Sequence, residues 1–217
     1  MNGAEFPDGI RKDRMKAVVY DKKKSPRFLE LMEVEKPNPG DNEVLVKIIA
    51  SSVNAADYRS IKMGIIPKRK IFGADIAGRI EEIGQNVTGF NVGDEVIGDT
   101  SNYGFGGFAE YVSVPESALV LKPSGVAFQT AASVPLAAVT ALQALRDKGN
   151  IKRGQKVLIC GAGGGVGTFA VQLAKYFGAE VTAVCSGKNV LMVNDSGADH
   201  VVHHFNREVQ LIKEIRV

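Results

Sequence analysis

Residues 156–186 read KVLICGAGGGVGTFAVQLAKYFGAEVTAVCS, which has the pattern of a strand, a glycine-rich turn, a helix and a second strand. Lys156–Cys160 is a short β-rich run with polar flanks, as expected for a buried parallel strand, and Glu180–Cys185 is the second strand. This order of elements predicts the half-unit of a doubly wound α/β fold that holds a dinucleotide pyrophosphate. A glycine-rich turn alone would be weak support, but the complete unit makes the prediction specific.

The turn Gly161–Gly167 has the sequence GAGGGVG. It departs from the strict G-x-G-x-x-G pattern and fits A-x-G-x-x-G instead. Gly164 has no Cβ, so backbone N–H groups can approach a pyrophosphate, and Gly167 allows the helix to pack closely on the strand. The alternative is a turn with a purely structural role. The cofactor-binding residues predicted from this turn are Ala162, Gly164, Gly165, Val166 and Gly167.

The helix after the turn is predicted to be amphipathic. Lys175 lies in its last turn, and Gly178 follows its end, where a left-handed residue is common. The apolar residues, which are expected to face the sheet, recur with i, i+3, i+4 spacing at Val166, Phe169, Ala170, Leu173, Ala174 and Phe177.

The end of the second strand indicates which cofactor is preferred. NAD-binding folds of this type carry an Asp or Glu there that holds the ribose 2′-hydroxyl, whereas this chain continues from Cys185 as Ser-Gly-Lys-Asn. Ser186 can donate a hydrogen bond to a 2′-phosphate and Lys188 can neutralise it, whereas an acid would repel it. These residues predict NADPH, and the alternative is that Lys188 is an ordinary solvated lysine.

Composition is that of a globular protein and excludes several classes of function. The 217 residues are 45% hydrophobic and 24% charged, and the net charge of +3 is too small to indicate nucleic acid or an anionic membrane as a partner. The sequence has neither an apolar run of membrane-spanning length nor a recognisable signal peptide. The two cysteines, Cys160 and Cys185, are interpreted as small core residues, which favours a reducing compartment and a cytoplasmic location.

The pattern changes near residue 125. Short β-rich segments separated by turn residues precede it, which suggests a compact, partly closed barrel. After it, the pattern becomes helical over Thr130–Arg146 and then alternates between strand and helix. A third parallel strand begins at Asp199–His204. The predicted parts are an irregular N-terminal extension (1–14), a β-rich domain (15–125) and a partial dinucleotide-binding domain (126–217). The predicted β-rich segments are Lys16–Tyr20, Phe28–Val34, Glu43–Ser52, Asp75–Ile83, Glu95–Ile97 and Ala109–Val114.

Six sequence motifs follow one another along the chain, namely SSVNAADYR (51–59), GADIAGRIEEIG (73–84), GDEVIGD (93–99), GGFAEYVSVP (106–115), VPLAAVTALQAL (134–145) and GAGGGVG (161–167). This series resembles the medium-chain dehydrogenase/reductase superfamily. Within that superfamily the chain is most similar to the zinc-free, NADPH-dependent quinone oxidoreductases related to zeta-crystallin. The resemblance covers about residues 15–205 and implies a GroES-like, partly closed β-barrel domain followed by a Rossmann domain that is incomplete here.

The resemblance also predicts that this chain is metal-free. The positions that match the catalytic zinc ligands of related alcohol dehydrogenases are Asn54, Ala74 and Leu136, which cannot form a soft N/S zinc site. The cysteines of the structural zinc loop are also missing over 99–107. His200, His203 and His204 form a second candidate for metal binding, which is disfavoured because no carboxylate lies at ligand spacing.

The resemblance implies that Asn54 and Tyr58 are the catalytic residues, as hydrogen-bond donors to a substrate carbonyl, and that Thr140 approaches the nicotinamide. Tyr58 has the alternative of packing on the cleft wall, and Thr140 that of bonding back to a helix carbonyl. For Asp57, helix capping or an internal hydrogen bond is favoured over catalysis. Tyr103 is a candidate for closing over a flat substrate, or merely a surface residue.

The expected function is hydride transfer from NADPH to a quinone or other conjugated carbonyl. The alternatives are an enoyl-thioester or alkenal reductase of the same superfamily, and a truncated NADPH-binding protein without turnover. Family members are much longer than this chain, so it is expected to be a fragment, to be completed by a partner copy, or to have impaired catalysis. The expected partners are a small-molecule quinone or enone and, for a full-length protein, a second subunit; neither a membrane nor nucleic acid is expected.

Overall fold

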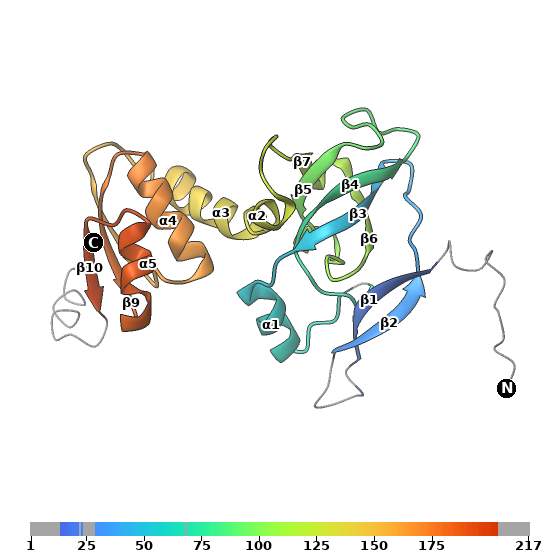
Figure 1. Ribbon diagram of the computed structural model, residues 1–217, viewed down its shortest axis with the longest axis horizontal. Helices are drawn as coiled ribbons and strands as arrows, with labels where there is room; N and C mark the ends of the chain where they lie inside the picture. Colours follow the sequence, from blue (N-terminus) through green and yellow to red (C-terminus); the bar gives the residue numbers. More distant parts are fainter. Residues whose placement is uncertain (1–13, 22, 24–28, 68, 204–217) are drawn as a thin grey trace, which may run out of the picture. The chain divides into compact units, whose positions relative to one another are not determined.

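The computed structural model describes residues 14–21, 23, 29–67 and 69–203 (Figure 1). The predicted extension over 1–14 lies almost entirely outside these residues. The chain divides into two compact units, Met1–Leu136 and Ala137–Val217. The domain ranges 15–125 and 126–217 stay a prediction, and the boundary between the compact units falls later, after Leu136.

The first unit is β-rich, as predicted. Its main sheet has five antiparallel strands in the order β6-β3-β4-β5-β7, and β1 pairs with β2 in a separate two-stranded sheet (Figure 1). The strand β7 was not predicted. The strands are β1 Arg14–Tyr20, β2 Leu29–Glu35, β3 Glu43–Ser51, β4 Asp75–Ile83, β5 Glu95–Asp99, β6 Tyr111–Pro115 and β7 Leu119–Leu121.

Alternation along β4 builds two layers of core in the first unit. Ile76 and Ile80 face a cluster of valines from neighbouring strands, which includes Val44 and Val96. Ala77, between them in sequence, faces the other way and packs on helix α2 (Phe128–Ala132). Because both faces are covered, the first four residues of β4, Asp75–Gly78, are all buried. This burial includes the carboxylate of Asp75.

The helices of the first unit and the junction differ from the prediction. The bounds of helix α1 (Ala55–Lys62) were not predicted, although helix capping was one interpretation of Asp57. The stretch Thr130–Arg146 is largely helical, as predicted, but it is not continuous: α2 ends at Ala132, and α3 (Pro135–Leu142) starts afresh and is followed by a π-helical stretch over Gln143–Lys148. Pro135 explains the break, since proline disfavours a helical residue before it and is well suited to the first helical position.

The second unit is a parallel α/β unit, as predicted. Its three described strands run in the order β10-β9-β8, and apolar residues of α4 and β9 form its core around Val171, Ala174 and Val181. A short 3-10 helix covers Gly187–Asn189 in this unit, and two more cover Ser101–Tyr103 and Glu116–Ala118 in the first unit. In sequence order the main elements of the unit are β8 Lys156–Cys160, α4 Gly165–Tyr176, β9 Glu180–Cys185, α5 Val190–Asp195 and β10 His200–His203.

Three expectations about burial in the second unit are wrong. Strand β8 is not a buried strand: Leu158 is 44% exposed and only Ile159 is buried, because β8 ends the described sheet order and α4 covers one face. Cys160 at its end is therefore exposed, whereas Cys185 is buried as predicted, and both are free thiols. The buried face of α4 includes Gly167, Val171 and Ala174 rather than Val166, which is 42% exposed.

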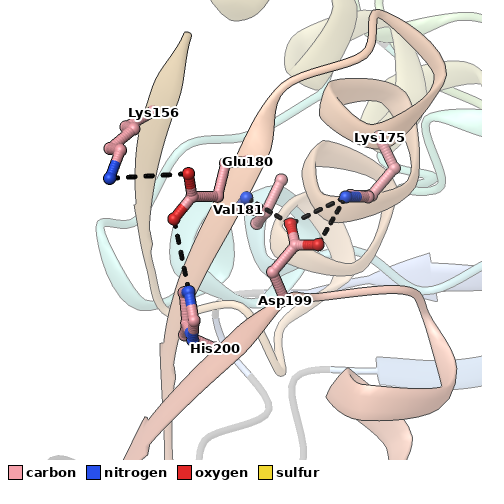
Figure 2. Close-up of polar contacts among 6 residues, drawn as sticks. All are labelled: Lys156, Lys175, Glu180, Val181, Asp199 and His200. Carbon is pink, nitrogen blue, oxygen red and sulfur yellow. Dashed lines mark hydrogen bonds and ion pairs between the residues drawn. The ribbon is translucent and has the colours of Figure 1, made fainter. Parts of the chain in front are cut away.

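Charged residues link the strands where they begin. Glu180 lies between Lys156 Nζ at 3.5 Å and His200 Nε2 at 3.3 Å, and Asp199 accepts hydrogen bonds from Lys175 Nζ and from the Val181 N–H, each at 2.7 Å (Figure 2). These polar contacts occupy the amino ends of the parallel strands. The turns that follow β8 and β9 therefore gather at the opposite, carboxyl edge, where α/β sheets bind ligands.

His200 and His203 are the first and last residues of β10, and positions three apart on a strand face opposite sides of the sheet, so they do not converge on one metal ion. His204 lies outside the described residues. No group of three potential metal-ligating side chains occurs within the part of the chain that the structure describes. Over the same residues, the helices are too short or too polar to cross a membrane.

Candidate functional site

The glycine-rich turn ends in an open helix N-terminus. Gly161 has a positive φ of 75°, and Gly164 both donates to the Gly161 carbonyl at 3.0 Å and serves as the N-cap of α4. The Thr168 N–H makes the first helical hydrogen bond, at 2.9 Å to the Gly164 carbonyl. The N–H groups of the residues from Gly165 to Gly167 precede that bond and have no acceptor within the helix, which is the arrangement that binds phosphates.

The space around two glycines separates a folding role from a binding role. A Cβ at Gly167 would lie 2.2 Å from the Gly161 carbonyl oxygen and 2.7 Å from the Ala162 Cα, so this glycine permits helix and turn to touch. A Cβ at Gly164 would meet only the Gly161 oxygen, at 3.3 Å. Gly164 is exposed, so its missing side chain leaves room on the outer side of the turn, where an anion can approach.

The turn after β9 lies beside the glycine-rich turn. Asn189 Nδ2 approaches the Gly163 carbonyl oxygen at 3.5 Å, and Ser186 accepts a hydrogen bond from the Asn189 N–H at 2.9 Å. Lys188, between them, is exposed. The structure thus brings the predicted residues Ser186 and Lys188 to the same edge as the predicted phosphate turn. Sequence reasoning missed Asn189, because its contact joins residues 26 positions apart.

In the first unit, Asn54 and Asp57 form the start of α1. The Asn54 N–H donates to Asp57 Oδ2 at 2.7 Å, which is the reciprocal arm of a capping box, so the predicted capping role of Asp57 agrees with the geometry. The other oxygen of Asp57 accepts from the Gly73 N–H at 3.2 Å. Burial raises the pKa of Asp57 above its ordinary value, and these hydrogen bonds reduce the rise.

The side chain of Asn54 points into the protein. Its Nδ2 donates to Asp75 Oδ2 at 2.9 Å and to Ser52 Oγ at 3.2 Å, so both amide hydrogens have partners. The expectation that this amide donates to a substrate therefore conflicts with the geometry, since a buried carboxylate competes for it. Tyr58, one turn along α1, is 47% exposed, and Lys62 Nζ lies 5.8 Å from its ring centroid.

Asp75 is the residue of this region that sequence reasoning missed. It is fully buried and accepts from Ser52 Oγ at 2.9 Å, Asn54 Nδ2 at 2.9 Å and the Leu136 N–H at 2.8 Å. Two of its partners, Asn54 and Leu136, are positions that the sequence resemblance predicts to match zinc ligands of related alcohol dehydrogenases, and the third such position, Ala74, precedes Asp75. No local signal reveals these bonds, because their partners are far apart in sequence.

The remaining candidates lie on exposed surfaces of their own units. Thr140 is an exposed residue of α3 in the second unit. Tyr103 is 38% exposed, and its Oη lies 3.3 Å from Ser117 Oγ. The predicted site residues therefore form two groups. Asn54, Tyr58 and Tyr103 belong to the first unit, and Thr140 and the candidates of the two turns belong to the second unit.

An antiparallel β-rich unit followed by a parallel unit with an open glycine-rich turn defines a class of two-unit dehydrogenases and reductases. In agreement, residues 40–124 match the alcohol dehydrogenase GroES-like domain. A chloroplast envelope quinone oxidoreductase homolog of Arabidopsis thaliana is 40% identical, over 85% of this chain and 59% of that protein. An acryloyl-coenzyme A reductase of Sulfurisphaera tokodaii is 32% identical, over 93% of this chain and 68% of that protein.

Solved structures agree with these relatives. The quinone oxidoreductase of Coxiella burnetii superposes with a TM-score of 0.82 at 31% identity, covering 92% of this chain and 65% of that one. A cobalt- and zinc-bound alcohol dehydrogenase of Pyrobaculum aerophilum gives 0.77 at 31% identity, covering 88% and 66%. The chain belongs to the medium-chain dehydrogenase/reductase superfamily and, within it, to the quinone oxidoreductase family, and it spans about 60% of the length of several relatives.

Proposed function

We propose that this protein is an oxidoreductase, or part of one, that uses NADPH to reduce a quinone or another conjugated carbonyl compound. The observation that supports this most is the open N-terminus of α4, with exposed Gly164 beside a turn that contains Ser186 and Lys188. Family membership supports a redox reaction on a small molecule, and the names of the relatives include quinone and acryloyl-coenzyme A reductases.

The residues of the second unit fit a dinucleotide phosphate. N–H groups from Gly165 to Gly167 would hold the pyrophosphate, and Ser186 and Lys188 would hold the 2′-phosphate, since the described turn from 186 to 189 contains no acid. Bound NADPH supplies a hydride. Thr140 is proposed to contact its nicotinamide end. This assignment of the cofactor predicts the effects of single lysine substitutions.

Lys188→Ala should weaken NADPH binding by about 1–3 kcal/mol, because a charge-assisted hydrogen bond to the 2′-phosphate is lost. NADH, which lacks that phosphate, should bind as before. Fluorescence titration with both cofactors measures the effect, and Lys152→Ala, which removes another exposed lysine of the same unit, is the control. Equal affinity of the unaltered protein for NADPH and NADH would show that Lys188 has no such role.

On the substrate side, we propose that Tyr58 orients the carbonyl group and that Asn54 supports α1 from within. Tyr58 is half exposed on α1, so its hydroxyl can reach a ligand, whereas the amide hydrogens of Asn54 are used by Ser52 and Asp75. A quinone or enone delocalises the charge that develops on reduction, so one hydrogen-bond donor and solvent protons are sufficient for the step.

The reaction class is tested by NADPH oxidation with a quinone, an enone and an enoyl thioester in parallel. We expect oxidation with a quinone or an enone. Preference for the thioester would favour an enoyl-thioester reductase, the second candidate, which the similarity to the acryloyl-coenzyme A reductase supports. NADPH binding without oxidation by any acceptor would reject the proposed enzyme in favour of a binding protein.

We further propose that the protein works without zinc, in a reducing compartment such as the cytoplasm. Asn54, Ala74 and Leu136 offer no soft ligand, and Asn54 and Leu136 already donate to Asp75. Elemental analysis should find no stoichiometric zinc after dialysis, and a chelator should leave both stability and NADPH oxidation unchanged. One tightly held zinc per chain would contradict this, and the zinc-bound structural neighbour makes the measurement worthwhile.

A further inference from the structure

The buried carboxylate of Asp75 joins three segments that are remote in sequence. Ser52 follows the end of β3, Asn54 caps α1, and Leu136 lies in the first turn of α3. Each donates one hydrogen bond of 2.8–2.9 Å to Asp75, which is 0% exposed. These four residues, which we name the Asp75 clasp, all belong to the first compact unit.

The hydrogen bonds hold the four residues of the Asp75 clasp in one conformation. An ionised carboxylate only accepts, and three donors on its two oxygens match that form. Burial raises the pKa of Asp75 above its ordinary value, and the bonds from Asn54, Leu136 and Ser52 offset part of this rise. A buried carboxylate that lost a donor would be strongly disfavoured, so Asn54 and Leu136 are held in place. The N-terminus of α3 also favours the negative charge.

We propose that Asp75 is a positioning residue that fixes the start of α1, and with it Tyr58, relative to the Leu136 amide. This inference rests on the proposed function, because Tyr58 is the residue assigned there to the carbonyl. Asp75 touches neither substrate nor cofactor in this proposal and acts through Asn54 and Leu136. Two other acidic groups, Asp57 on α1 and Asp99 on β5, use different donor atoms: Asp57 accepts from the backbone N–H groups of Asn54 and Gly73, and Asp99 accepts from the Ser101 N–H.

Two variants separate positioning from mere folding. Asp75→Asn places an amide group opposite the Asn54 amide, so their hydrogen bond is weakened and the start of α1 can shift. We expect kcat to fall by about 100-fold, since small displacements of a catalytic group cost about this factor. The double variant Asn54→Asp/Asp75→Asn exchanges the two groups, so the carboxylate at position 54 can accept from the amide at position 75. The kcat of the double variant should be at least about tenfold higher than that of Asp75→Asn, because the hydrogen bond between positions 54 and 75 is restored. A tenfold change corresponds to about 1.4 kcal/mol.

The matched control is Thr100→Val. Thr100 is also fully buried, and its hydroxyl donates to the carbonyls of Gly73 and Ala74, each at 3.0 Å, rather than to Asn54 or Leu136. This variant should lose stability while keeping kcat, and NADPH affinity should be unchanged in all three variants. An Asp75→Asn protein that is folded and keeps the parent kcat would overturn the proposal, as would a double variant with no recovery.

Hydrogen exchange at the Leu136 amide gives a readout that does not depend on turnover. Exchange should be at least about tenfold faster in Asp75→Asn than in the parent, because the acceptor of this amide is weakened, and Thr100→Val should leave it unchanged. If the parent protein oxidises no NADPH with any acceptor, the proposed function is rejected independently of the variants. The clasp is then judged by exchange: unaltered exchange in Asp75→Asn rejects it, and faster exchange supports it.

Discussion

Gly164→Val is expected to abolish dinucleotide binding, with affinity reduced at least about 100-fold, or roughly 2.7 kcal/mol. A β-branched side chain at this exposed position would fill the space in front of the N–H groups that begin α4, where the pyrophosphate is proposed to bind. The second unit should stay folded, because a Cβ there meets only the Gly161 oxygen, at 3.3 Å, and the backbone has an ordinary φ of −92°.

Fluorescence titration with NADPH measures the loss, and circular dichroism monitors the fold. Gln172→Val, an exposed position two turns further along α4, is the control for placing valine on this helix. It should bind NADPH like the parent. Retained binding in Gly164→Val would mean that the glycine-rich turn only connects β8 to α4.

Gly167→Ala is expected to unfold the second unit, at a cost of about 3 kcal/mol. The added methyl group would lie 2.2 Å from the Gly161 carbonyl oxygen and 2.7 Å from the Ala162 Cα, and both are backbone atoms that cannot rotate away. The first unit has its own core and should remain folded. Hydrogen exchange measured separately for each unit detects this selective loss.

Gly165→Ala is the matched control for folding, because the nearest atom to its Cβ is that of Ala137 at 4.0 Å. It should be as stable as the parent or slightly more stable, since alanine is a better helix former than glycine. Equal stability of Gly167→Ala and Gly165→Ala would contradict the close contact between the helix and the turn.

Local patterns explain why much of the fold could be predicted. The turn, α4 and β9 are specified by neighbouring residues, and Gly178 ends the helix with a φ of +79°, as its position predicted. Features that depend on distant contacts were missed. The exposure of Cys160 follows from the place of β8 in the sheet, and the break before Pro135 follows from proline geometry that outweighed a continuous apolar pattern.

The candidate site shows the same division. The phosphate turn and the residues Ser186 and Lys188 could be predicted, because adjacent parallel strands bring their turns to one edge. The direction of the Asn54 amide could not, since it depends on Asp75, 21 residues away, and on its bond to Leu136, 61 residues further on. Long-range hydrogen bonds to a buried acid leave no periodic signal in the sequence.

Hydride transfer from NADPH to a conjugated carbonyl compound is the central proposal for this protein. The most direct measurement uses NADPH in which both hydrogens at C4 of the nicotinamide are deuterium, an enone as acceptor, and mass spectrometry of the product. We expect deuterium on the carbon β to the carbonyl, and no transfer with Gly164→Val. The proposal would be contradicted if NADPH binds but the enone gives no labelled product, and if neither the enone nor a quinone is consumed faster than in buffer.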